Sequence, residues 1–275
     1  MLLDQFLSYF FLILFLSSHF IESAQEKPMV IFIPSYNNSR WCKDNLKSTI
    51  QEYTNYRIVY VDDCSSDTNM QEIEAFKQEF PEHAKKITVI ENSARQGALA
   101  NAYMVISECA DQEIIVFLDG DDFLYDAHVL ETLHKTYSES DVWLTYGSLT
   151  MWPHTGYAFQ AHKIPTEFIE LPDGIRRWPY AATHLRTFYA GLFKKIRKES
   201  LLYEEQFYSM AWDIALMSPM LEMARERHAF ITDTLYIYNT NNPLSDHNVN
   251  RALQLQLHCH IQTLAPYERL ESLWN

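Results

Sequence analysis

The chain has 275 residues, of which 47% are hydrophobic, and its 22 basic and 36 acidic residues give a net charge of -14. This length and apolar content can form the core of one large domain or two small ones, which excludes a disordered protein. The negative charge argues against long-range attraction to nucleic acid or anionic lipid, so a polyanionic substrate would need a local basic patch.

Residues 1–24 differ in composition from the rest of the chain. Residues 6–21 are almost continuously apolar, but as a helix they would span only about 24 Å, less than the ~30 Å hydrocarbon core of a membrane. This length, and the small residues Ser23 and Ala24, favour a cleaved signal peptide and a location in the secretory pathway or cell envelope. The alternatives are an uncleaved anchor that gives membrane association, since Asp4 but no Lys or Arg precedes the segment, or an element of the protein core.

Apolar runs alternate with amphipathic segments from residue 29 onward. Strands are predicted for residues 29–34, 57–61, 87–90 and 113–118, and helices for residues 41–51, 69–80 and 98–110. The strands are almost entirely apolar, as expected for strands that are buried on both faces. This alternation predicts an α/β fold in which helices flank a mostly parallel central sheet.

A polar loop follows each of these strands. The carboxyl ends of parallel strands lie at one edge of a sheet, and open α/β sheets bind ligands at that edge. We therefore expect six loop residues to converge there: Tyr36, Asp62, Asp63, Arg95, Asp119 and Asp121.

The pattern is less regular after residue 122. Helices are predicted for residues 127–137, from Asp213 onward and for residues 251–263, and strands for residues 142–146, 184–189 and 230–238. Residues 151–180 contain several prolines and little periodicity, which predicts loops and short elements over the sheet edge.

The loop after the fourth strand carries three carboxylates in four residues, Asp119-Gly120-Asp121-Asp122. Carboxylates this close repel one another unless a cation or a hydrogen-bond network compensates, and hard divalent cations prefer oxygen ligands. Asp and Gly are also the residues that turns use. Alone, this tetrapeptide predicts either a metal site or a polar turn.

Four segments together resemble the successive motifs of nucleotide-sugar glycosyltransferases with the GT-A fold, specifically glycosyltransferase family 2. They are residues 33–37, 61–67, 92–97 and 118–122, and their order and spacing agree with the family over residues 29–146. A weaker match continues at residues 211–213, where Trp212 replaces the commoner Glu, and through the loops at 238–239 and 242–243.

The resemblance implies a Rossmann-like GT-A domain with two parts. Residues 25–150 would form the half that binds the nucleotide sugar. Residues 151–275 would form a smaller half of the same domain, which binds the acceptor and carries the catalytic base.

The resemblance also implies roles for individual side chains. Asp121 would hold Mn²⁺ or Mg²⁺, Asp119 would contact the ribose or the metal, and His247 would be a further ligand, although a His in a polar loop is usually just solvated. Tyr36 would stack on the base, and Arg95 would contact the diphosphate unless it is only a solvated surface residue. The full set of expected donor-binding residues is Pro34, Ser35, Tyr36, Asp62, Asp63, Arg95, Gly97 and Asp119.

Asp213 is the expected catalytic base. Inversion at the anomeric carbon needs a base opposite the leaving group, and the family places it at the start of the helix after the acceptor loop. An acid in a first helical turn is also favoured by the helix dipole, and Asp caps helices, so a structural role is the alternative.

We therefore expect a metal-dependent, inverting glycosyltransferase that moves a sugar from a nucleoside-diphosphate sugar, with UDP favoured, to a glycan, lipid or protein hydroxyl. A sugar-phosphate nucleotidyltransferase would need a Gly-rich, basic loop after the first strand, and residues 34–37 contain neither feature. A non-catalytic protein that binds sugar nucleotides or glycans remains the other alternative, because fold does not determine function. The presence of both Asp121 and Asp213 weighs against it.

Overall fold

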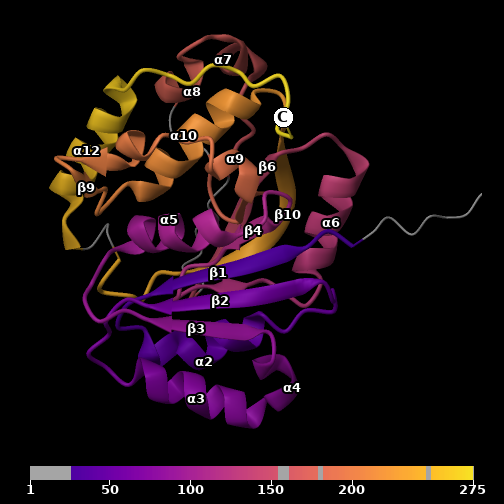
Figure 1. Cartoon of the computed structure of the whole chain (residues 1–275), viewed down its shortest axis with the longest axis vertical. Coiled ribbons are helices and arrows are strands. Elements are labelled where there is room, and N and C mark those ends of the chain that lie inside the picture. Colours follow the sequence, from indigo (N-terminus) through magenta and orange to yellow (C-terminus); the bar gives the residue numbers. More distant parts are fainter. Residues whose placement is uncertain (1–25, 154–160, 179–181, 246–248, 275) are drawn as a thin grey trace, which may run out of the picture.

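The computed structural model of the chain describes residues 26–153, 161–178, 182–245 and 249–274 (Figure 1). The predicted leader over residues 1–24 and the candidate ligand His247 lie outside these ranges. Within them, no helix has both the length and the apolar character that a membrane crossing requires.

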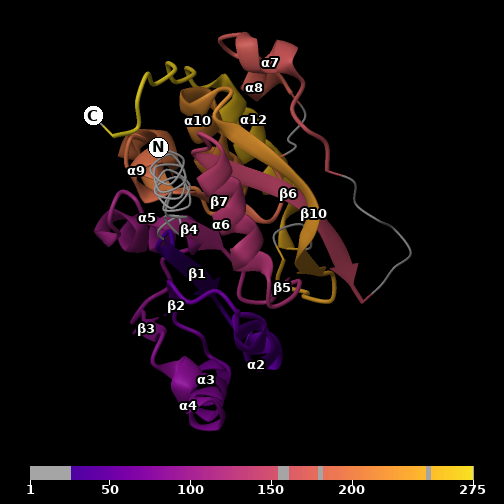
Figure 2. The same ribbon diagram turned by 90° about the vertical axis from the view of Figure 1, so that its right-hand side faces the viewer.

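The first half of the chain has the predicted alternation of strands and helices. Its strands are β1 (Met29–Ser35), β2 (Tyr56–Asp62), β3 (Ile87–Glu91) and β4 (Ile114–Phe117), and its helices are α2 (Ser39–Ser48), α3 (Asn69–Glu79), α4 (Pro81–Ala84) and α5 (Ala98–Glu108). β1 pairs in parallel with β2 and β4, and β2 pairs in parallel with β3. All residues of β1 and β4 are buried, because α2 and α5 lie on opposite faces of this part of the sheet (Figure 2).

The second half adds strands to the same sheet. These strands are β5 (Phe123–Leu124), β6 (Leu144–Trp152), β7 (Arg186–Tyr189) and β10 (His228–Asn239), while β8 (Leu202–Tyr203) and β9 (Gln206–Phe207) form a separate hairpin. The helices of this half are α6 (Val129–Glu139), α7 (Thr166–Glu170), α8 (Gly174–Arg177), α9 (Ala190–Phe193), the 3₁₀ helix η1 (Lys198–Leu201), α10 (Trp212–Ala224) and α12 (Arg251–Thr263).

The eight strands of the main sheet are ordered β3-β2-β1-β4-β7-β6-β10-β5. β6 and β10 are parallel, whereas β7 is antiparallel to both of its neighbours and β5 is antiparallel to β10. The predicted mostly parallel sheet is therefore confirmed, and β7 joins its two parallel groups. The strand predicted for residues 184–189 begins only at Arg186, and β6 extends past the predicted end at residue 146 because it pairs with β10 as far as Trp152.

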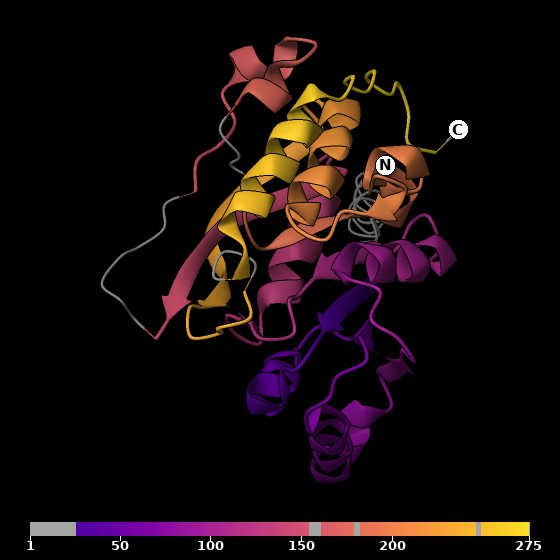
Figure 3. The ribbon, with the colours of Figure 1, turned by 90° about the vertical axis from the view of Figure 1, so that its left-hand side faces the viewer.

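α10 brings its first residues to the end of β4. Nearly the whole helix is buried, since it packs against α12, α5 and α8, and Figure 3 shows α10 and α12 side by side. The ring of Trp212 stacks on Phe117, the last residue of β4, with ring centroids 4.9 Å apart. This contact holds the start of α10, and therefore Asp213, beside the carboxyl end of the sheet.

Candidate active site

A pocket of about 250 Å³ lies at the carboxyl ends of β1 and β4, next to the start of α10. Of the six residues expected to converge at the sheet edge, Tyr36, Arg95, Asp119 and Asp121 line this pocket, and so do the candidate site residues Pro34 and Asp213. The remaining predicted residues of the described ranges, Ser35, Asp62, Asp63 and Gly97, do not line it. Four carboxylates and two guanidinium groups line the pocket, so it carries an excess of negative charge.

The acidic loop of residues 119–122, which we call the DGDD loop, is held by side chains from other elements. The buried amide of Asn45 on α2 donates to the backbone oxygens of Asp119 (2.9 Å) and Asp122 (2.7 Å). From β10, the Tyr236 hydroxyl and the Asn239 N–H each donate to the Asp122 carboxylate, both at 2.7 Å. Asp122 therefore ties the loop to β10 and is almost fully buried.

Asp121 contacts Asn242, which lies in the loop after β10. The amide of Asn242 donates to its Oδ2 at 2.7 Å. Burial, with the negative charge of Asp119, raises the pKa of Asp121 to about 6. Burial, and then the negative charges of Asp121 and Asp119, also raise the pKa of Asp122.

Asp119 lies near two basic residues, His184 just before β7 and Arg186 at the start of β7. Its Oδ2 lies 3.2 Å from His184 Nε2, and that nitrogen lies 2.9 Å from Arg186 Nη1. Burial alone would raise the pKa of Asp119, but the contact with His184 and the nearby positive charge outweigh it and lower the pKa. Burial, and then the charge of Arg186, lower the pKa of His184, and this shift favours the neutral imidazole.

The donor set fits a divalent cation. Asp119, Asp122 and His184 each place a ligand atom within 4.8 Å of the others, and Asp121 lines the same pocket. Carboxylate oxygens are the preferred ligands of hard cations, and a neutral imidazole is also a metal ligand. Both Asp122 oxygens already accept hydrogen bonds, and Asp119 and Asp121 stay the predicted cation ligands.

Asp213 is the second residue of α10 and does not cap it. The N-cap position is Ala211, whose φ of 53° is left-handed, and no side chain caps this end of the helix. The Asp213 Oδ2 accepts from Arg186 Nη2 at 2.9 Å, and its Oδ1 accepts from the N–H of Ile214. Asp213 is therefore not the N-cap residue, although it does lie in the first turn of the helix, and its carboxylate points to the pocket and to Arg186.

Tyr36 and Arg95 contact each other across the pocket. The guanidinium carbon of Arg95 lies 3.9 Å from the centre of the Tyr36 ring, although the two residues follow different strands. Arg95 is otherwise exposed, so this cation–π contact, and not burial, fixes its position. The predicted contacts of both side chains with a nucleotide sugar stay predictions.

Ser35 and the acids after β2 are used to build the neighbouring loops. The Ser35 hydroxyl accepts from Tyr60, and Asp62 accepts from the N–H of Ser65 and the amide of Asn69. Asp63 accepts from the N–H groups of Gln96 and Gly97 and from the amide of Asn92, all at 2.8 Å. Gly97 has a φ of 91°, which L side chains rarely adopt, and this conformation accounts for glycine at that position.

Four residues that contact the acids of the site were not predicted from the sequence: Asn45, His184, Arg186 and Tyr236. A weak signal exists for His184 and Arg186, because alternation along a strand places residues two apart on one face, and both interrupt an apolar stretch. Asn45 and Tyr236 carried no such signal, since each lies within an ordinary helix or strand pattern.

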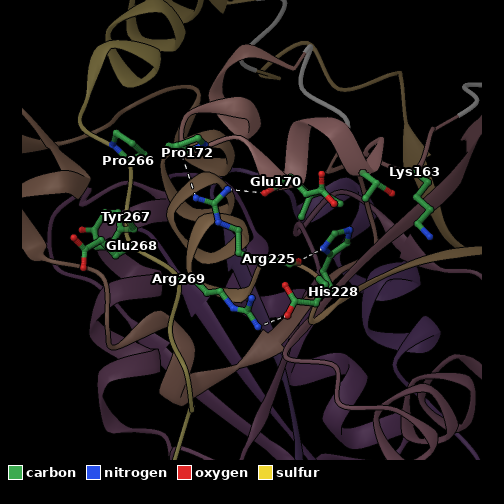
Figure 4. A pocket seen from close by; sticks show the side chains of 12 residues that line it. Lys163, Glu170, Pro172, Arg225, His228, Pro266, Tyr267, Glu268 and Arg269 are labelled. Carbon is green, nitrogen blue, oxygen red and sulfur yellow. Dashed lines mark hydrogen bonds and ion pairs between the residues drawn. The ribbon is translucent and has the colours of Figure 1, made fainter.

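A second and larger cavity, of about 940 Å³, lies at the first residue of β10 and has different electrostatics (Figure 4). Its charged lining residues are three basic and three acidic ones: Lys163, Arg225, Arg269, Glu170, Glu226 and Glu268. Arg225 donates to the backbone oxygens of Ile169 and Pro172, and Arg269 pairs with Glu226. Because its charges balance, this cavity lacks the clustered carboxylates that a cation requires, and the smaller pocket is the better candidate site.

Comparisons with known proteins support the same assignment. The family model described as glycosyl transferase family 2 matches residues 30–201. The minor teichoic acid biosynthesis protein GgaA of Bacillus subtilis is 24% identical over 76% of this chain and 46% of its own length, and glycosyltransferase GlyG of Streptococcus pneumoniae is 24% identical over 76% of this chain and 69% of its own length. The chain thus spans about half the length of GgaA.

Solved structures show the same fold at low identity. Staphylococcus aureus TarS residues 1–349 with UDP-GlcNAc superposes with a TM-score of 0.56 at 16% identity, over 78% of this chain and 59% of that one. The mannosyltransferase PcManGT of Pyrobaculum calidifontis with GDP-Man and Mn²⁺ superposes with a TM-score of 0.57 at 16% identity, over 84% and 62%. The resemblance found in the sequence is confirmed: this chain has the GT-A fold and belongs to glycosyl transferase family 2.

Proposed function

We propose that the protein is an enzyme that transfers a sugar, with inversion, from a nucleoside-diphosphate sugar to an acceptor hydroxyl, and that a UDP-sugar is the donor. The observation that carries this proposal is that the Asp119–Asp121 pair and Asp213 line one pocket. The Asp119–Asp121 pair suits a cation that would bind the donor diphosphate, and Asp213 suits the acceptor hydroxyl. The matched family and the nucleotide sugars bound by TarS and PcManGT support the donor class.

On the donor side, Asp119 and Asp121 would hold Mn²⁺ or Mg²⁺. Such a cation, when bound, offsets the negative charge that develops on the diphosphate leaving group. Tyr36 offers a ring beside the pocket for the nucleotide base, and the Arg95 guanidinium supplies positive charge next to it.

On the acceptor side, Asp213 would take the proton of the attacking hydroxyl. Its carboxylate lies at the start of a buried helix, and the bond to Arg186 restricts its orientation. A general base needs such a fixed geometry, because proton transfer requires hydrogen-bond distance to the reacting hydroxyl. The acceptor is a hydroxyl of a glycan, lipid or protein.

The leader remains part of the proposal. We infer that residues 1–24 direct the protein to the secretory pathway or cell envelope and are then cleaved. Mass spectrometry of the mature protein should find an amino terminus near Gln25. Recovery of an intact chain in a membrane fraction would establish the anchor instead.

The deciding experiment is a screen of the purified protein against nucleotide sugars with and without Mn²⁺, with release of the nucleoside diphosphate and the mass of the acceptor product as readouts. Cation-dependent turnover of a UDP-sugar supports the proposal. Binding of a nucleotide sugar with no turnover in the presence of varied acceptors would favour a non-catalytic binding protein on the same scaffold.

A further inference from the structure

Arg186 lies between the two chemical halves of the pocket. It belongs to β7, which is antiparallel to its neighbours, and its side chain is only 4% exposed. Its Nη2 donates to Asp213 Oδ2 at 2.9 Å, and its Nη1 lies 2.9 Å from His184 Nε2. A third nitrogen, Nε, donates to the backbone oxygen of Ala182 at 3.2 Å. Three directions of the planar guanidinium are thereby fixed.

His184 continues this chain of contacts to the donor side. The same Nε2 lies 3.2 Å from Asp119 Oδ2, and the ring stacks on Tyr236 at a centroid distance of 4.4 Å. The other ring nitrogen, Nδ1, is buried and has no hydrogen-bond partner among the described residues.

The Nε2 atom cannot serve both neighbours at once. Arg186 only donates and a carboxylate only accepts, so an unprotonated Nε2 bonds to Arg186 and a protonated Nε2 bonds to Asp119. When Nε2 is unprotonated it accepts from Arg186, whose other nitrogen holds Asp213.

From this geometry we propose that Arg186 is a positioning residue that orients the Asp213 carboxylate, and that its contact with His184 helps to hold Arg186 in place. This inference rests on the proposed function, in which Asp213 accepts the proton of the acceptor hydroxyl.

A second buried pair on the same helix provides a matched control. Arg176 of α8 pairs with Glu222 near the end of α10 at 2.6 Å, and both side chains are as buried as Arg186. Neither Arg176 nor Glu222 lines the candidate pocket. Removing Arg176 therefore costs a buried ion pair on α10 without touching the reacting groups.

The test compares Arg186→Ala, Arg186→Lys, His184→Phe and Arg176→Ala in the full chain, with a UDP-sugar and Mn²⁺ as probes. Arg186→Ala should lower kcat by ~10²-fold with the donor KM unchanged, because a misplaced catalytic group costs about that much. Added guanidinium chloride at millimolar concentration should restore part of kcat in Arg186→Ala. It should not do so in Arg176→Ala, whose loss is one of stability.

The other two variants grade the effect. A lysine keeps the charge but cannot contact both Asp213 and His184, so Arg186→Lys should retain an intermediate kcat, and it guards against misfolding of the alanine variant. His184→Phe keeps the ring on Tyr236 and should lose less than Arg186→Ala, because the bond to Asp213 remains.

The outcomes separate this inference from the proposed function. A wild-type protein that turns over no nucleotide sugar contradicts the proposed function. If the wild type is active and Arg186→Ala changes only the donor KM, Arg186 binds the diphosphate and does not position Asp213. An unchanged kcat in Arg186→Ala would also overturn the positioning role. So would a lowered kcat that guanidinium does not restore. A His184→Phe variant with wild-type kcat would show that His184 does not contribute to the positioning of Arg186 and Asp213.

Discussion

Two acidic loops follow neighbouring parts of the same sheet, yet their carboxylates have opposite surroundings. After β2, Asp63 accepts three hydrogen bonds from the segment of residues 92–97, and these outweigh the effect of burial and lower its pKa. After β4, Asp121 has one amide partner and a second carboxylate nearby, and its pKa is raised to about 6. The first loop uses its charge to fold the chain, and the second keeps its charge available for a ligand.

The comparison shows that an acid-rich loop at the carboxyl edge of a sheet is not by itself a site. What separates the two loops is the supply of hydrogen-bond donors, which stabilise a carboxylate and occupy its lone pairs. Asp63 takes its donors from a loop that packs against it, whereas the donors near the DGDD loop from Tyr236 and Asn239 are consumed by Asp122. Asp119 and Asp121 are left to face the pocket.

The largest expected effect comes from the pocket acid on the acceptor side. Asp213→Asn should lower transfer by ~10² or more, the usual scale for loss of a general base, while donor affinity and stability stay the same. The measurement is transfer rate beside donor calorimetry and thermal unfolding. Near-wild-type transfer would mean that Asp213 only supports the start of α10, and that the base lies elsewhere.

Asp121→Asn tests the donor side of the same pocket. We expect cation-dependent donor affinity to fall by at least ~10-fold, because loss of an outer-shell partner alone costs 10–100-fold in metal sites. Calorimetry with a UDP-sugar and Mn²⁺ gives the affinity, with Mn²⁺ omitted as the control. An unchanged affinity would remove Asp121 from the cation site and erase the contrast with Asp63.

Asp63→Asn should show the reverse pattern. The amide replaces one acceptor oxygen by a donor that faces N–H groups, so the unfolding free energy should fall by roughly 1–3 kcal/mol, the cost of unsatisfied buried donors. Urea unfolding measures this, with the exposed acid Glu108→Gln as control. Cation affinity should change little. A stable Asp63→Asn protein that has lost Mn²⁺ affinity would instead place Asp63 in the site.

The sequence predicted the first half of the fold well because each of β1 to β4 is an uninterrupted apolar run with a polar loop after it. It could not predict that β7 is antiparallel, because Arg186–Tyr189 is too short to carry a periodic signal. Nor could it separate Asp63 from Asp121, because their partners, Gln96 and Asn242, lie far away in the sequence. The loops were placed by the strand pattern, but the function of each acid depends on tertiary contacts.

The stabilities of the two loops should also depend on pH in opposite directions when the protein is kept in EDTA. The pKa of Asp121 is raised from 3.8 to about 6 on folding, so between those values the native state binds the extra proton and the unfolding free energy falls as pH rises. Above pH 6 the folded carboxylate carries its full penalty, and Asp121→Asn should be more stable than wild type by roughly 1–3 kcal/mol, with no difference near pH 3.

For Asp63 the lowered pKa reverses the sign: its stabilisation is present above the unfolded pKa and is lost as pH falls through the folded one. Asp63→Asn should therefore be less stable than wild type at pH 8, and that gap should close in acid. Urea unfolding of the two variants and wild type from pH 3 to 8 gives both difference curves. If these curves slope in the same direction, the two loops do not differ in the way that their hydrogen bonds indicate.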